Sequence, residues 1–143
     1  MRYREVIRPS FWLLSFIYFL FLSLVVSIWA ALGNTPALIS LVFLTASLAL
    51  MAKRMEMVIE VNGGELRIDR AHIDFMYLGK VTALSEDEMK KIRTRDADPA
   101  AYLAIRFWVS AGVKVEIKDP RDTTPYWIIS TKRGEDLVKA LKN

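Results

Sequence analysis

Two apolar runs without any polar face occupy the first part of the chain. Residues 11–32 (FWLLSFIYFLFLSLVVSIWAAL) carry no charged side chain, and residues 37–52 (ALISLVFLTASLALMA) form a second, shorter run. As helices they would reach roughly 33 Å and 25 Å, compared with about 30 Å for the bilayer core. Gly33, Asn34 and Pro36 interrupt the helical pattern between them. We therefore expect a transmembrane helical hairpin over residues 11–52, with helices 11–32 and 37–52 joined by a loop over residues 33–36.

Two other kinds of segment also contain an apolar run. A cleaved signal peptide has a shorter apolar core and a small-residue cleavage site. A soluble helical hairpin would place charged side chains on its outer faces, whereas residues 9–52 contain no Asp, Glu, Lys, Arg or His. Both alternatives therefore fit the pattern less well than a membrane hairpin does.

The period of the pattern changes from helical to strand-like after Arg54. The run MEMVIEVNGGELRID places Met57, Ile59 and Val61 on one face, and its Asn-Gly pair is a strong hairpin signal. One or two further strands are expected in AHIDFMYLGKVTAL. The run SEDEMKKIR then predicts a short helix over Ser85–Arg93, in which Ser85 and Glu88 form a capping box.

The last third of the chain predicts three more strands and a closing helix. AYLAIRFWVSAGVKVEIKDP is expected to form a strand–turn–strand hairpin, and residues 126–131 a final strand. Residues 134–142 predict an amphipathic helix with Leu137, Val138 and Leu141 on its inner face. Residues 55–143 are thus predicted to be a cytoplasmic α+β domain with a mostly antiparallel sheet. A strongly bent sheet or partly open barrel closed by a C-terminal helix is typical of pleckstrin-homology-like domains. Residues 1–10 are predicted to be a cytoplasmic N-terminal segment.

Cations at both ends of the apolar block predict its orientation. Arg2, Arg4 and Arg8 precede it, Lys53 and Arg54 follow it, and the loop between the runs is uncharged. By the positive-inside rule, both termini lie in the cytoplasm, which predicts a multi-pass protein of the cell membrane.

Small residues recur along both apolar runs, at four-residue and seven-residue spacing. They lie at positions 23, 27 and 31 and at positions 40 and 47. Such residues let helices approach closely. They fit packing within the hairpin, or a homo-oligomer contact between hairpins.

Charge balance argues against nucleic acid as a partner. The chain has 20 Lys and Arg and 16 Asp and Glu. Without Arg2, Arg4, Arg8 and Glu5, the part from residue 53 onward retains 17 cations and 15 acids. A domain so evenly charged lacks the basic surface that binds phosphate backbones.

The chain offers little catalytic chemistry. It contains no cysteine and a single histidine, His72, so neither a disulfide nor a Cys/His metal site is expected. No phosphate-binding glycine loop, nucleophile elbow or paired-histidine motif occurs. We expect no catalytic residue, no cofactor and no metal.

Aromatic residues in two predicted strands form a candidate interaction surface. Neighbouring residues of a regular strand point to opposite faces of a sheet, so one aromatic of each adjacent pair would be exposed unless both faces are covered. The candidate surface consists of Phe107, Trp108, Tyr126, Trp127, Lys132 and Arg133.

Several of these segments together resemble a known family. YRE near the start, the two apolar runs, RDADPAAYLAIRFWV and DPRDTTPYWIISTKR are similar to the actinobacterial domain-of-unknown-function 3093 family. The resemblance covers nearly the whole chain and implies a small membrane protein without an assigned activity. Phe107 and Gly134 stand where the family pattern has proline.

A membrane-anchored, non-enzymatic interaction module or accessory subunit is the function that these observations favour. Its expected partners are the lipid bilayer and either a membrane protein or a second copy of the chain. A first alternative is a sensor of anionic lipid head groups that uses Lys53, Arg54, Lys132 and Arg133. A second alternative is an enzyme that acts on a membrane-borne substrate.

Overall fold

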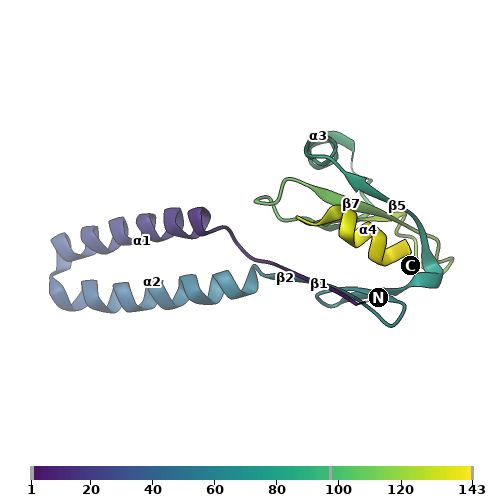
Figure 1. Cartoon of the computed structure of the whole chain (residues 1–143). Coiled ribbons are helices and arrows are strands. Elements are labelled where there is room, and N and C mark those ends of the chain that lie inside the picture. The colour runs from purple at the N-terminus through teal and green to yellow at the C-terminus, as the bar shows by residue number, and fades with distance from the viewer. Residues whose placement is uncertain (1, 97, 143) are drawn as a thin grey trace. The chain divides into compact units, whose positions relative to one another are not determined.

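The computed structural model describes residues 2–96 and 98–142. The chain forms two compact units (Figure 1). One unit is continuous and comprises Arg8–Glu56. The other combines the residues up to Ile7 with those from Met57 onward, so the first unit is inserted into the second.

The inserted unit is a helical hairpin. Helix α1 spans Phe11–Leu32 and helix α2 spans Asn34–Arg54, and the two pack side by side (Figure 1). Ser10 caps α1, because its side chain accepts a hydrogen bond from the backbone N–H of Leu13 at 3.2 Å. Both helices are long and apolar enough to cross a membrane.

The turn of the hairpin is shorter than predicted. The predicted loop over residues 33–36 is wrong, because α2 already begins at Asn34. Gly33 alone separates the helices, and its φ of 91° lies in the region that favours glycine. Pro36 does not interrupt α2, because the first-turn N–H groups of a helix have no intrahelical partner that proline could remove.

Small residues of the two helices have different surroundings. Ser40 and Ser47 of α2 are partly buried within the hairpin, whereas Ser23 and Ser27 of α1 are exposed. All four hydroxyls donate to the carbonyl four residues earlier, which satisfies them inside their own helix. The partial burial of the α2 residues is compatible with packing within the hairpin.

The first sheet of the β-rich unit is an antiparallel meander. Its strands β1 (Tyr3–Ile7), β2 (Met57–Asn62), β3 (Glu65–Ile68) and β4 (Ala71–Asp74) lie in chain order. β1 pairs with β2 from Tyr3↔Val61 to Ile7↔Met57. The expected boundary at residue 55 assigned residues 1–10 to a separate segment, whereas the structure makes Tyr3–Ile7 a strand of the β-rich unit.

The second sheet is mixed. It contains β5 (Leu78–Leu84), β7 (Gly112–Ile117), β8 (Tyr126–Ser130) and β6 (Tyr102–Ala104), in the spatial order β5-β7-β8-β6. The predicted hairpin between residues 101 and 120 is wrong, because β6 pairs in parallel with β8 and not with β7. The backbone N–H of Arg106 bonds to Ser130 Oγ at 2.9 Å, which directs the chain away from an antiparallel return.

Two helices of the β-rich unit agree with their sequence signals. Helix α3 covers Glu86–Lys91 and has the capping box predicted for Ser85 and Glu88. It continues into a π-helical turn at Ile92–Asp96. Helix α4, Gly134–Lys142, packs on β5 and β7 (Figure 1).

One core joins both sheets and α4. Ile59, Leu66 and Ile68 come from the first sheet, Val113 from the second, and Leu137 from α4, and all are buried. The inward residues alternate with outward ones that are polar except for Val58 along β2 and β3, as expected for a sheet with one face toward solvent.

Candidate functional site

A buried carboxylate links the beginning of the chain to its end. Glu5 lies on the inner face of β1 and is 8% exposed. Its Oε2 accepts hydrogen bonds from the hydroxyls of Tyr3, at 2.8 Å, and of Thr131. Its Oε1 accepts from the backbone N–H of Lys132 at 3.1 Å. Glu5 therefore ties β1 to the junction between β8 and α4.

The ring of Tyr3 forms the outer part of this cluster. The guanidinium of Arg133 lies 5.0 Å from the ring centre, and Arg133 also pairs with Asp136 of α4 at 3.1 Å. Burial, together with the hydrogen bond to Glu5, raises the pKa of the Tyr3 phenol above its ordinary value of 10.0. Tyr3 therefore remains a neutral donor throughout the physiological range.

The surroundings of the Glu5 cluster favour a structural role over a catalytic one. A buried carboxylate is tolerated when hydrogen bonds replace its hydration, and both oxygens of Glu5 are engaged. No motif in the sequence marks Glu5 as a functional residue. The available signal was its position: Glu5 has the same strand phase as the apolar Tyr3 and Ile7, so alternation places it inside.

The four aromatic candidates do not form one surface. Trp127 is buried, at 6% exposure, with its ring centre 5.1 Å from that of Tyr102. Tyr126 is partly buried; Lys114 lies over its ring, and its hydroxyl accepts a hydrogen bond from the backbone N–H of Asp98 at 2.8 Å. These contacts explain both residues by packing.

Phe107 behaves differently, because 65% of it is exposed. It sits in a turn in which the N–H of Val109 bonds to the carbonyl of Arg106 at 3.0 Å. Arg93, just after α3, donates from Nη2 to the carbonyls of both Arg106 and Val109. The ring of Trp108 meets that of Phe107 edge-on at 5.0 Å. The structure thus holds Phe107 in an ordered turn with its side chain outward.

Trp108 itself is half-buried beneath this turn. Among the described residues, its indole N–H has no hydrogen-bond partner although the nitrogen is buried. An unpaired buried donor costs free energy, and the contacts of Trp108 that offset this cost are apolar, with the ring of Phe107 and with the core.

The cations of the candidate sites lie in several places. Arg4 points outward from β1 and pairs with Glu60 at 3.4 Å, and Arg8 pairs with Glu56 at 3.7 Å. Lys53 and Arg54 form the exposed last turn of α2. Three further candidates, Arg2, Lys132 and Arg133, are also exposed.

A polar cleft of about 380 Å³ lies between β3, β4 and the loop before β8. Arg121 donates to the hydroxyl of Tyr77 at 2.8 Å and to Asp119 at 3.3 Å. Hydrogen bonds from the backbone N–H of Arg121, and then from its guanidinium, lower the pKa of Asp119. The hydrogen bond to Asp119 and the negative charge of that carboxylate raise the pKa of Arg121. On the other wall, His72 Nδ1 lies 3.2 Å from Glu65. The charges of the cleft are therefore largely paired with each other.

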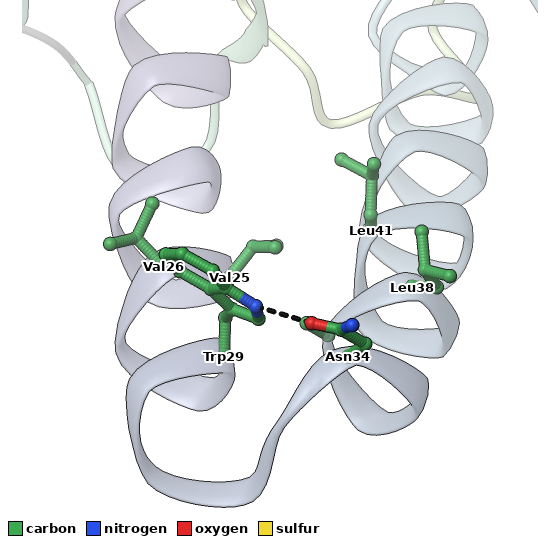
Figure 2. Close-up of a pocket in the computed structure, with 7 residues that line it drawn as sticks. Val25, Val26, Trp29, Asn34, Leu38 and Leu41 are labelled. Carbon is green, nitrogen blue, oxygen red and sulfur yellow. Dashed lines mark hydrogen bonds between the residues drawn. The ribbon is translucent and has the colours of Figure 1, made fainter.

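A second cleft, of about 280 Å³, lies near the turn of the hairpin (Figure 2). One polar contact crosses it: Trp29 Nε1 donates to Asn34 Oδ1 at 2.6 Å, and this bond closes the turn. The remaining lining is apolar and comes from both helices: Val25, Val26, Ala37, Leu38 and Leu41.

Among the described residues, no group of three His, Asp or Glu side chains is placed to hold a metal ion. The residues predicted as candidates are thus distributed over an exposed turn, a packed strand and two helix ends. Glu5, by contrast, has hydrogen bonds to both of its carboxylate oxygens.

Comparison with known proteins identifies the family. A family model described as "Protein of unknown function (DUF3093)" matches residues 2–141. No curated protein and no solved structure matches the chain. The match includes the β1 residues that contribute Glu5, both hairpin helices and nearly all of α4. The chain therefore belongs to the DUF3093 family.

Proposed function

We propose that the protein is a membrane-anchored, non-enzymatic interaction module or accessory subunit. In this proposal the hairpin crosses the cell membrane twice, and both termini and the β-rich unit lie on the cytoplasmic side. Two helices of sufficient length and apolar character support the anchor. The charge distribution supports the orientation, because Arg8, Lys53 and Arg54 flank the open end of the hairpin and its turn is uncharged.

The pairing of β1 with β2 is the observation that carries the proposal. These strands flank the hairpin in sequence, and Ile7 lies opposite Met57 in the sheet. Both ends of the hairpin therefore continue into the β-rich unit. Two connections attach this unit to the hairpin, in place of one flexible linker. A partner bound by the β-rich unit would thereby be held close to the membrane.

We also propose that the β-rich unit is a variant of the pleckstrin-homology-like fold. Two four-stranded sheets and a C-terminal helix on the common core support this relation. The parallel strand β6 and the hairpin inserted after β1 are departures from a simple antiparallel arrangement.

Site-specific photo-cross-linking in native membranes tests the module. Leu103 is a suitable position, because it is 46% exposed on the edge strand β6. Met76, which is 77% exposed, is the matched control. We expect a photoreactive amino acid at position 103 to give a reproducible adduct with another membrane protein, identified by mass spectrometry. Identical products at both positions would contradict the proposal.

Recognition of anionic lipid head groups through Lys53, Arg54, Lys132 and Arg133 remains the first alternative. Arg133 already engages Asp136 and the ring of Tyr3, which reduces its availability, whereas the Lys132 side chain is exposed. The second alternative, an enzyme on a membrane-borne substrate, would require reacting groups that converge on a cleft. The polar cleft around Arg121 is the place where substitutions would test it.

A further inference from the structure

The exposed Phe107 turn lies at a defined end of the β-rich unit. β1 ends and β2 begins at this end, with Ile7 opposite Met57. The turn between β3 and β4 lies there as well, because the N–H of Asp69 bonds to the carbonyl of Val58 at 3.0 Å. Arg106 Nη2 then lies 3.9 Å from Asp69 Oδ2. The Phe107 turn is therefore beside the point where the chain leaves for the hairpin and returns from it.

The chain between the units is too short to carry this end far away. Residues 8–10 separate β1 from α1, and residues 55–56 separate α2 from β2. An extended residue spans at most about 3.6 Å, so neither connection exceeds roughly 15 Å. If the hairpin spans a bilayer, this end of the β-rich unit remains next to the membrane surface.

Side-chain chemistry at this end matches an interfacial membrane contact. Phe107 supplies an exposed aromatic ring, supported edge-on by Trp108. Arg70, in the turn after β3, is exposed, and Arg93 and Arg106 hold the Phe107 turn. Arg70, Arg93 and Arg106 thus place three cations around the turn, beside Asp69. Aromatic rings favour the head-group region, and cations favour anionic lipids.

We propose that the Phe107 turn, residues 105–111, is a second membrane contact that inserts Phe107 among the head groups of an anionic bilayer. The inference rests on the proposed membrane anchor. It adds to that anchor a lipid-binding surface on the folded unit, with Arg70, Arg93 and Arg106 as its cations. The contact fixes the orientation of the β-rich unit on the membrane.

Fluorescence quenching with the full chain in lipid nanodiscs tests the contact. The chain has no cysteine, so a single introduced cysteine carries an environment-sensitive fluorophore without background. Ser110→Cys, at an exposed position, reports on the turn and keeps Phe107 in place. Met76→Cys is the control: it is exposed and follows β4, beside the β2–β3 turn, where the Phe75 N–H bonds to Gly64 O. That turn is at the opposite end of the sheet. Phe43→Cys reports on α2.

In nanodiscs that contain phosphatidylglycerol and a nitroxide lipid labelled near the head group, we expect strong quenching at position 110. We expect little at position 76, and weaker quenching at the turn in pure phosphatidylcholine. In the Ser110→Cys chain, Phe107→Ser should abolish the quenching. Arg70→Gln should reduce the inserted population roughly fivefold, equivalent to about 1 kcal/mol, and Arg67→Gln on the outer face of β3 should not.

Two results separate this inference from the anchor. A probe at position 43 that is shielded from aqueous iodide, together with a turn probe that matches position 76, would overturn the membrane contact and leave the anchor intact. A probe at position 43 that is quenched by aqueous iodide would overturn the anchor, and the inference with it. Equal quenching of the turn in anionic and neutral discs would overturn the choice of anionic lipid.

Discussion

Glu5 is held by donors from both ends of the chain, and its contacts have measurable consequences. The hydroxyls of Tyr3 and Thr131 and the backbone N–H of Lys132 all point to its carboxylate. Removing a buried acceptor leaves its donors without partners, which costs more than the hydrogen bonds contribute on balance.

Glu5→Ala should therefore destabilise the β-rich unit by about 3 kcal/mol, since each stranded donor costs about 1–3 kcal/mol and the hydroxyls can partly reorient. Urea unfolding of the full chain in detergent, followed by near-ultraviolet circular dichroism, measures the change. Glu60→Ala is the matched control: its partner Arg4 is exposed, so the loss should stay below about 1 kcal/mol. If both variants lost the same free energy of unfolding, the Glu5 cluster would not be a stabilising element.

The raised pKa of Tyr3 predicts how stability depends on alkaline pH. The folded state keeps the phenol protonated, because burial and the bond to Glu5 disfavour the phenolate. The unfolded state loses this proton near the ordinary pKa of 10.0. Above that pH the unfolded state binds fewer protons than the folded state, so stability falls as pH rises.

Tyr3→Phe should remove this contribution. Its melting temperature should decline less than that of the parent chain between about pH 9.5 and 11, the range in which free tyrosine titrates. Tyr126→Phe provides the control for other alkaline titrations. If the melting temperatures of all three chains fell equally between these pH values, the prediction of a buried Tyr3 that stays protonated would be contradicted.

At the scale of elements, the junction of α3 with the second sheet leaves no space for an added side chain. Met89 of α3 is buried against the start of β7. A Cβ on Gly112 would lie 2.6 Å from the carbonyl oxygen of Ile129 and 2.7 Å from Met89 Sδ. Gly134, at the start of α4, has its nearest neighbour at 3.6 Å, an ordinary contact.

Gly112→Ala should lower the free energy of unfolding by about 2–3 kcal/mol. The added Cβ would clash with the backbone of β8 and push β7 away from it. Gly134→Ala should be close to neutral, since alanine fits and favours a helix. Thermal unfolding of the two variants gives the comparison. An unaffected Gly112→Ala would mean that α3 packs more loosely on the sheet than described.

Elements specified by local sequence were predictable, and elements specified by distant partners were not. Residues 11–32 match α1, and the Ser85 and Glu88 pair correctly marks the start of α3. β1 escaped prediction because its partner β2 follows only after the whole hairpin. β6 has three residues and pairs in parallel with β8, and so short a strand carries no pattern that specifies its direction. The Glu5 cluster depends on β1, and it was missed together with that strand.

At the scale of the whole molecule, the hairpin is an insertion that the β-rich unit can lose. Ile7 and Met57 form the last pair of the β1–β2 ladder. A two-residue Asn-Gly turn can join such a pair in an antiparallel hairpin.

Replacing residues 8–56 with Asn-Gly should therefore yield a water-soluble, folded β-rich unit. Residues 57–143 alone should fold poorly, because they lack β1, which covers the edge of β2 and supplies Glu5. Dispersion of amide signals in NMR spectra distinguishes the two chains. If both chains were equally folded, β1 would not be an integral part of the unit.

The position of β1 before the hairpin also bears on biosynthesis. The ribosome produces β1 first, but its partner β2 emerges only after both helices have been made. A hairpin that inserted with a single crossing would leave β1 and β2 on opposite sides of the bilayer, and the first sheet would lack its edge strand. Completion of this sheet would then act as a check on insertion, because a chain with a single crossing would leave the edge of β2 unpaired and open to quality-control proteases.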